Sequence, residues 1–134
     1  MEIRSCSRYI ESEILPLYQA VGWSNYYERP EMLCRAFQNS LCILSAYEDN
    51  TLVGILRAVG DGASILLIQD ILVHPQYQRR GIGTKLMRAV LERYETVYQI
   101  QLMTDNTEKT IAFYKSLGFL PMQECSCVGF VKMC

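Results

Sequence analysis

Residues 64–73, SILLIQDILV, constrain the fold of this chain more than any other segment. The run is too rich in aliphatic and β-branched residues for an exposed strand, so it predicts a central strand buried on both faces. His74 and Pro75 end this strand. Asp70 is its only charged residue, and a carboxylate in such surroundings must be paired or have its pKa raised. With 134 residues the chain is long enough to enclose one core of this kind.

The rest of the pattern alternates short strands with amphipathic helices. Helices are predicted at residues 14–21, 30–39 and 83–95, and a fourth begins at the capping segment 105–108 and ends at Gly118. Further strands are predicted at residues 1–6, 42–47, 52–58, 99–103, 119–122 and 127–132. This succession is typical of a mixed α+β architecture. No linker or repeat interrupts it, so residues 1–134 are expected to form a single domain.

The charge balance excludes several classes of partner. Thirteen Lys and Arg residues face 14 Asp and Glu residues, giving a net charge of −1. Proteins that bind nucleic acid or anionic membranes carry a basic excess, so neither partner is expected. No apolar run approaches the roughly 18–20 residues that cross a bilayer. The first residues contain no apolar signal region, so a cytoplasmic protein is expected.

Metal chemistry is not expected either. His74 is the only histidine, whereas HExxH and Cys2His2 zinc sites need at least two. No CxxC pair occurs, and a reducing compartment disfavours disulfides. The sequence therefore predicts no metal, and structural or surface thiols at all six cysteines: Cys6, Cys34, Cys42, Cys125, Cys127 and Cys134.

The stretch from Val73 to Thr84, VHPQYQRRGIGT, leads from the apolar strand through a polar loop and two glycines into a helix. Glycines there let an anion approach the backbone, and the first N–H groups of a helix are unpaired donors. Residues 77–93 carry a net charge of +4, and the rest of the chain carries −5. This pattern predicts a phosphate-binding loop. The alternative is that Gly81 and Gly83 only shape a tight turn between solvated arginines, since the P-loop and complete Rossmann motifs are absent.

Three segments resemble one known family. The sequence QRRGIG at residues 78–83 matches the Q/R-x-x-G-x-G/A signature of the GNAT N-acetyltransferase superfamily. ILVHP at residues 71–75 resembles the core strand of that family, and AFYKSLGF at residues 112–119 resembles its FYxxxGF element. The resemblance implies a largely antiparallel central sheet with one splayed parallel strand pair and helices on both faces. It also implies acetyl-CoA as the acetyl donor.

The resemblance further implies which residues hold acetyl-CoA. Backbone amides of residues 79–84 would bind the pyrophosphate, and the pantetheine would run along residues 71–73 like an added strand. A main-chain N–H near Leu72 or Val73 would polarise the thioester carbonyl. Asparagine is common in the family where Thr107 stands here, and Asn106 lies next to it. The implied cofactor-binding residues are Ile71, Leu72, Val73, Gln78, Arg79, Arg80, Gly81, Ile82, Gly83, Thr84 and Asn106.

The family mechanism transfers the acetyl group directly to an amine. Tyr114 occupies the position of the general acid that protonates the leaving thiolate; the alternative is an ordinary core tyrosine. Some family members carry a glutamate base where this chain has Leu67. Asp70 is therefore the expected base, and the alternatives are a buried structural carboxylate that caps a loop or pairs with an arginine, or His74 as the base.

The acceptor is expected to meet the first two helices and their loop, where Trp23, Tyr26 and Tyr27 are either cleft walls or packing residues. Residues 21–23, 37–40, 69–73 and 77–78 also resemble the serotonin N-acetyltransferase-like branch. We therefore expect a small primary amine, such as an arylalkylamine, as substrate. A protein or peptide N-acetyltransferase and a non-catalytic acyl-CoA-binding module stay open as alternatives, as does a homodimer.

Overall fold

The structure is a computed structural model that describes residues 1–6 and 8–133. The chain divides into two compact units, Met1–Leu102 and Met103–Cys134. The expectation of a single domain stays a prediction. Cys134 lies outside the described residues, and the other five cysteines are free thiols.

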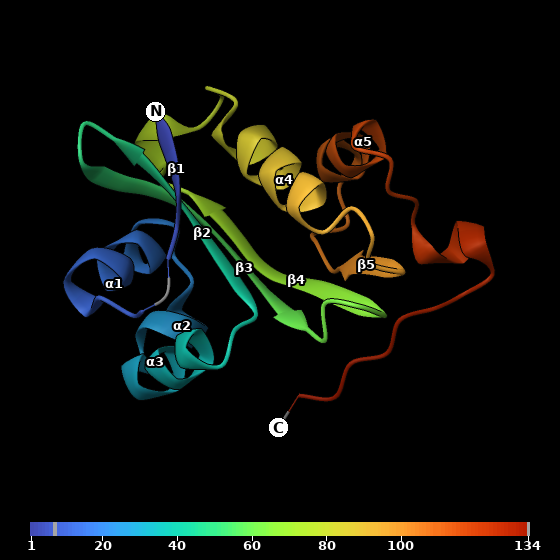
Figure 1. Ribbon diagram of the computed structural model, residues 1–134, viewed down its shortest axis with the longest axis horizontal. Coiled ribbons are helices and arrows are strands. Elements are labelled where there is room, and N and C mark those ends of the chain that lie inside the picture. Colours follow the sequence, from blue (N-terminus) through green and yellow to red (C-terminus); the bar gives the residue numbers. More distant parts are fainter. Residues whose placement is uncertain (7, 134) are drawn as a thin grey trace. The chain divides into compact units, whose positions relative to one another are not determined.

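The first unit is built on a five-stranded sheet whose spatial order follows the chain (Figure 1). Its strands are β1 (Glu2–Ser5), β2 (Cys42–Glu48), β3 (Thr51–Gly60), β4 (Ile65–Val73) and β5 (Gln99–Leu102). The first four strands pair antiparallel, and β5 pairs parallel to β4. The predicted α+β class and the implied parallel strand pair are therefore confirmed.

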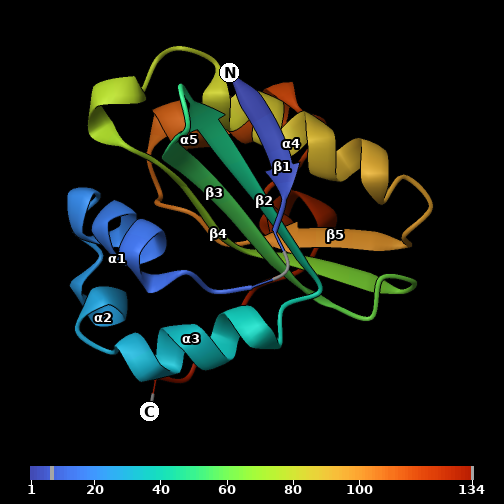
Figure 2. The same ribbon diagram turned by 60° about the vertical axis from the view of Figure 1, so that its left-hand side comes forward.

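Helices cover both faces of this sheet (Figure 2). One face carries α1 (Glu11–Ala20), α2 (Ser24–Tyr27) and α3 (Pro30–Gln38), and the other carries α4 (Ile82–Arg93). Neighbouring residues of a strand point to opposite faces. Accordingly, Ile55 packs with α1 and α3, whereas a side chain at Gly54 would meet Ile82 and Leu86 of α4.

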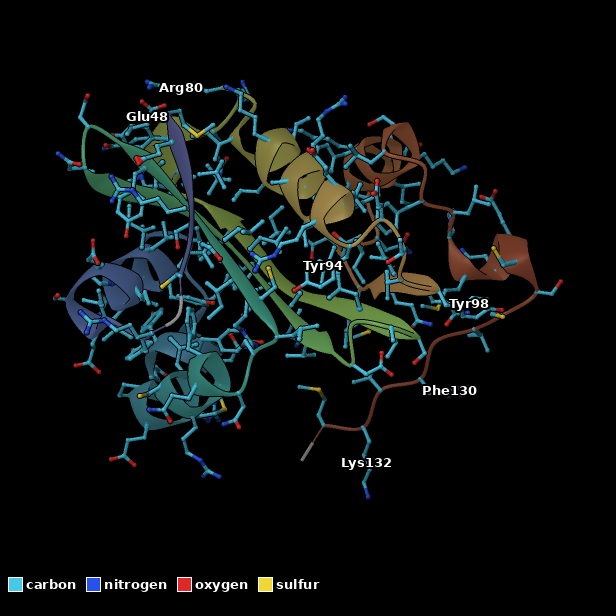
Figure 3. All side chains as sticks on the ribbon, in the orientation of Figure 1. Glu48, Arg80, Tyr94, Tyr98, Phe130 and Lys132 are labelled. Atoms are coloured by element: carbon cyan, nitrogen blue, oxygen red, sulfur yellow. The ribbon has the colours of Figure 1, made fainter. Side chains whose placement is uncertain are left out.

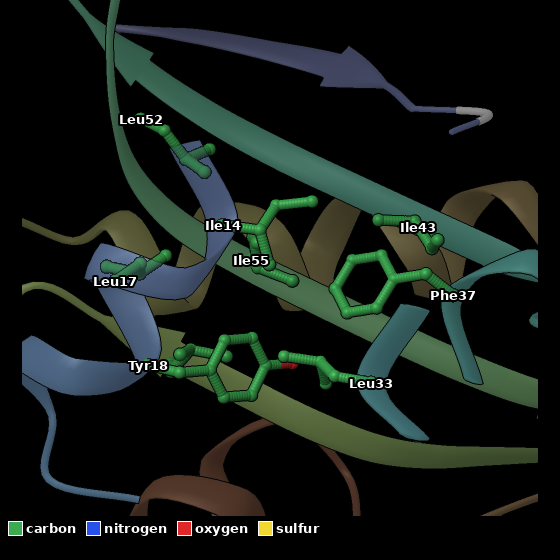
Figure 4. Packing of buried hydrophobic residues seen from close by; sticks show 9 residues of the cluster. Ile14, Leu17, Tyr18, Leu33, Phe37, Ile43, Leu52 and Ile55 are labelled. Carbon is green, nitrogen blue, oxygen red and sulfur yellow. The ribbon is translucent and has the colours of Figure 1, made fainter. Parts of the chain in front are cut away.

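The core beneath α1 and α3 is apolar and closely packed (Figure 4). The spacing of Ile14, Leu17 and Tyr18 places all three on one face of α1, as the sequence pattern predicts. The nine buried residues of this cluster are Ile14, Leu17, Tyr18, Leu33, Phe37, Ile43, Leu52, Ile55 and Leu72. Through this cluster, the N-terminal helices pack against β3 and β4.

The prediction that β4 is buried on both faces is wrong. Alternate residues are buried, and those between them are half-buried or exposed. The register with β3 shifts between Arg57 and Ala58, whose partners are Asp70 and Ile68, so Gln69 is an extra residue in β4. Paired residues share a face, so Ile68 lies with Ala58 on the α4 face and Asp70 lies with Arg57 on the α1–α3 face. Each half of β4 is therefore covered chiefly on one face.

The second unit contains α5 (Glu108–Ser116) and the short 3-10 turn η2 (Met122–Cys125). The closing strands predicted at residues 119–122 and 127–132 are wrong, because residues 119–133 contain no strand. Pro121 precedes η2, and Ser126 ends it with a positive φ of 60°. The following segment is extended and its apolar side chains are exposed; Phe130, labelled in Figure 3, is 91% exposed.

The other predicted elements are found within a few residues of their expected bounds. Three short elements were not predicted from the sequence pattern: α2, η2 and the 3-10 turn η1 (Pro75–Tyr77). Within residues 1–6 and 8–133, no helix combines the length and the apolar character that crossing a membrane requires.

Candidate functional site

The parallel strand β5 pairs with only the first part of β4. Their pairing runs from Ile65 opposite Gln99 to Ile68 opposite Leu102 and then stops. Beyond this point, and among the described residues, Asp70 to Val73 pair with β3 alone, and Gln69 is left out of the ladder. The open side of this segment offers main-chain groups to an extended ligand, as a sheet edge does.

The hydrogen-bond pattern identifies which of these groups are available. The His74 N–H donates to the Val53 carbonyl at 2.8 Å. Because antiparallel ladders alternate, the N–H and C=O of Leu72 also point toward β3, whereas those of Ile71 and Val73 point toward the open side. The Gln78 amide Nε2 donates to the Val73 carbonyl at 3.1 Å, which agrees with this direction. Of the two predicted oxyanion donors, Val73 N–H therefore faces the opening and Leu72 N–H does not.

The loop between β4 and α4 is held by local contacts. The His74 ring accepts a hydrogen bond from the Gln76 N–H through Nδ1 at 3.1 Å, so this histidine caps η1. Arg79 and Gly81 have positive φ angles of 65° and 79°. The left-handed conformation at Gly81, the N-cap of α4, is one that glycine adopts without strain. The sequence pattern therefore correctly located a tight turn here.

The first turn of α4 has free donors. Gly81 has no side chain to cap the helix, and the first intrahelical bond runs from the Lys85 N–H to the Gly81 carbonyl at 3.0 Å. Among the described residues, the N–H groups of Ile82, Gly83 and Thr84 have no partner. A Cβ placed on Gly83 would find no atom within 4 Å.

The basic residues expected at this loop are also in place. The Arg80 guanidinium lies 5.0 Å from the centre of the Tyr77 ring, on the loop before α4 (Figure 3). Arg79 and Arg80 are both exposed. Positive charge, a helix N-terminus and free N–H groups thus coincide, which is the chemistry of an anion site.

Asp70 belongs to a buried polar network. Its Oδ2 accepts hydrogen bonds from Arg57 Nε at 2.7 Å and from the Tyr18 hydroxyl at 2.9 Å. The Asp70 side chain is 1% exposed and that of Arg57 is 6% exposed. Within the described part of the chain, Asp70 Oδ1 has no partner. This arrangement matches the structural alternative of a carboxylate paired with an arginine, and the base role of Asp70 stays a prediction.

The pKa shifts in this network follow from burial and charge. Burial, reinforced by the Asp70 charge, strongly raises the pKa of Tyr18, which therefore stays protonated. Burial acts to lower the pKa of Arg57, but the Asp70 charge and hydrogen bond outweigh it and raise that pKa. The sequence pattern missed Arg57 as a partner, although it is the only charged residue between Thr51 and Gly60, as Asp70 is in β4.

Tyr114 lies in α5 and is 9% exposed. Its ring packs edge-on against those of Phe113 and Phe119, at centroid distances of 5.0 and 6.0 Å. Burial raises the pKa of Tyr114, opposed by a hydrogen bond with Thr104. A raised pKa keeps the phenol protonated at neutral pH, which a general acid requires.

The corner before α5 departs from the predicted capping box. The Thr107 Oγ1 caps the helix by accepting a hydrogen bond from the Thr110 N–H at 3.2 Å. Thr110 thus stands where a capping box has glutamate or glutamine. Asn106 is exposed in the preceding loop, and its assignment to cofactor binding stays a prediction.

The three aromatic residues predicted to meet the acceptor are all half-buried and pack against the α1–α3 core: Trp23, Tyr26 and Tyr27. The Tyr18 ring contacts Trp23 and Tyr26 edge-on, at centroid distances of 6.0 and 5.5 Å. Gln69, the extra residue of β4, reaches the Tyr26 hydroxyl through Nε2 at 3.4 Å. The aromatic cluster therefore adjoins the strand where β4 leaves β5. No sequence signal marked Gln69, because its exposure depends on the register shift.

No group of three or more metal-ligating side chains occurs within residues 1–6 and 8–133. The comparison with known families gives a more informative result. A family model described as the acetyltransferase (GNAT) family matches residues 8–119. This match includes β4, the loop before α4, and α5.

Individual proteins agree with this match. An acetyltransferase of the GNAT family from Streptococcus pneumoniae TIGR4 is 41% identical, with a TM-score of 0.90 over 98% of this chain and 96% of that one. The uncharacterized N-acetyltransferase ycf52 of Gracilaria tenuistipitata is 35% identical over 111 residues, 78% of this chain. The chain spans only 58% of that relative's length.

A more distant structure shares the fold. AAC(6')-Iy, in complex with the bisubstrate analogue CoA-S-monomethyl-acetylneamine, has a TM-score of 0.74 and 17% identity. The superposition covers 99% of this chain and 98% of that one.

Proposed function

Since the chain belongs to the GNAT acetyltransferase family, we propose that it transfers the acetyl group of acetyl-CoA to the primary amine of a small molecule. The observation that carries the proposal is the continuity of free main-chain groups. They begin on the open side of β4 and continue, across one loop, at the N-terminus of α4.

The chain's own residues suit acetyl-CoA. The N–H groups of Ile82, Gly83 and Thr84 would bind its pyrophosphate, with Arg79 and Arg80 adding positive charge. The main-chain groups of Ile71 and the Val73 N–H would pair with the pantetheine arm. The clear space around the Gly83 Cα supports this assignment, because a phosphate must come close to the backbone.

The reaction needs an oxyanion donor, a general acid and a general base. Val73 N–H would donate to the thioester oxygen as negative charge develops there. As the amine nitrogen bonds to the acetyl carbon and the carbon–sulfur bond breaks, Tyr114 would give its proton to the sulfur. The amine loses a proton to a base. Asp70 remains the proposed base, and its Oδ1, which has no partner among the described residues, would accept that proton.

The acceptor class follows from the aromatic residues beside the opening. Tyr26 offers half-buried aromatic surface next to Gln69, and Trp23 packs against Tyr26; this combination suits an amine attached to an apolar or aromatic body. The CoA-linked analogue bound by AAC(6')-Iy supports a small acceptor on this fold.

The proposal predicts acetyl-CoA-dependent thiol release with free amines. Purified full-length chain is mixed with acetyl-CoA and a panel of arylalkylamines, aliphatic diamines, aminosugars and lysine-containing peptides. Release is followed by a thiol reagent, and the acetylated product is identified by mass spectrometry. We expect turnover on free amines, with arylalkylamines giving the highest kcat/KM.

Two outcomes of this assay would contradict the proposed acetyl transfer to small-molecule amines. Turnover on peptides alone would make the chain a protein acetyltransferase. CoA binding by calorimetry without release on any acceptor would make it a non-catalytic acyl-CoA-binding module.

A further inference from the structure

The extra residue in β4 lies where the strand leaves its parallel partner. Pairing with β5 ends at Ile68, and Gln69 is the next residue. Bulges leave a residue out of the ladder and increase local twist, so they are disfavoured inside a sheet unless other contacts hold them. The bulge therefore lies where the opening begins.

Two buried charges flank the bulge. Arg57 and Asp70 are register partners on β3 and β4, directly beside the shift. Their 2.7 Å ion pair is extended by the Tyr18 hydroxyl on Asp70 and by a 3.3 Å hydrogen bond from Arg57 to Ser40 Oγ. The pair is therefore tied to α1 and to the end of α3 as well as to the sheet.

We propose that Arg57 and Asp70 form a positioning pair that fixes this bulge, and so keeps β4 open for the donor; this role rests on the acetyl-CoA site proposed above. Without the extra residue, one half of β4 would turn its side chains to the opposite face. Asp70 would then leave Arg57 and point toward the apolar face beneath α4. Apolar contacts tolerate either register more readily, whereas a buried ion pair is satisfied in one arrangement only.

Losing a positioning pair is expected to have a different effect from losing a catalytic base at Asp70. A base removes the proton of the amine, so its loss changes kcat and abolishes the acidic limb of the pH profile. A positioning pair acts on the shape of the donor site. Its loss therefore weakens CoA binding even in the absence of an acceptor.

The test replaces both charges together, Arg57→Met with Asp70→Leu, so that no buried charge is left without a partner. Such exchanges are often neutral or stabilising, and the variant is expected to fold. We expect the Kd of CoA and the KM of acetyl-CoA to rise by about tenfold or more, because small displacements of binding groups have effects of this size. Because Asp70 is also the proposed base, kcat is expected to fall in this variant, and the Kd of CoA is the measurement that reports on the positioning role.

Amide hydrogen exchange in the unliganded protein gives a readout independent of activity. The Ile71 N–H faces the opening and should exchange rapidly in the native chain. It should exchange more slowly in the double variant, where the parallel ladder can extend past Ile68 and Leu102. Leu44→Ala is the control for lost stability alone, since Leu44 is buried on β2, which pairs with β1 and β3 and not with β4; it should lower the urea midpoint and leave the Kd of CoA unchanged.

An unchanged Kd in the folded double variant would overturn the proposal. Loss of the acidic limb with an unchanged Kd would also overturn it and assign Asp70 as the base. If the double variant does not fold, Arg57→Lys keeps the charge but not the planar donor group, and a Kd unchanged by that replacement would count equally against the pair. Failure of the native chain to bind CoA would instead refute the donor site itself.

Discussion

Replacing Gly83 with leucine is expected to raise the Kd of CoA by more than about 100-fold while leaving the protein at least as stable. Gly83 lies in the first turn of α4, and its neighbourhood is open. Leucine favours a helix over glycine by up to about 1 kcal/mol. Its side chain would cover the N–H groups that the diphosphate needs. Losing two charge-assisted hydrogen bonds costs about 3 kcal/mol or more, which is two orders of magnitude in affinity.

Calorimetry with CoA and urea unfolding measure the two effects separately. Gly83→Ala should give a smaller loss of affinity, so that binding falls with the size of the side chain. Glu92→Leu is the matched control, because Glu92 is exposed on the same helix outside its first turn. If Gly83→Leu bound CoA as the native chain does, the diphosphate would not be held at the N-terminus of α4.

The Tyr114→Phe variant is expected to lower kcat by about 100-fold, the lower range for loss of a general acid. The KM of acetyl-CoA should change by less than about twofold, because phenylalanine keeps the ring and its contacts with Phe113 and Phe119. The thiolate must then leave without a proton from the enzyme. Steady-state kinetics with the best amine of the panel measures this change.

The pH dependence provides a second check on Tyr114. An acid acts only while it holds its proton, so kcat falls as pH rises through its pKa. Burial raises the pKa of Tyr114 above its ordinary value of 10.0, so the alkaline limb of the native enzyme should lie above pH 10. Tyr114→Phe should lack that limb. Tyr98→Phe is the control, since Tyr98 is 82% exposed, and an unchanged kcat in Tyr114→Phe would remove this phenol from the mechanism.

Local periodicity was sufficient to predict most of the fold. The helix predicted at residues 83–95 is found at Ile82–Arg93, because its apolar spacing and its glycine entrance are properties of consecutive residues. The loop and helix start to which we assign phosphate binding as a proposal were located for the same reason. The glycines, the basic residues and the helix start lie within one short segment.

What the sequence did not predict depends on pairing between distant strands. The Arg57–Asp70 ion pair and the exposure of Gln69 result from the register of β3 against β4, and strand pattern alone does not contain that register. The prediction of closing strands at residues 119–122 and 127–132 was wrong for a related reason. Their alternation is suited to a sheet, but Pro121 and the left-handed Ser126 interrupt the chain between them.

The hydrogen bond from Gln78 to the Val73 carbonyl limits how far the loop before α4 can move from the end of β4. It joins the loop to the strand, so the spacing between the proposed thioester contact on β4 and the proposed diphosphate contact on α4 is fixed within a few residues of chain. Under this proposal, one donor molecule would engage both contacts at once. Truncated thioesters would engage only the strand and would lose the gain of a two-point attachment.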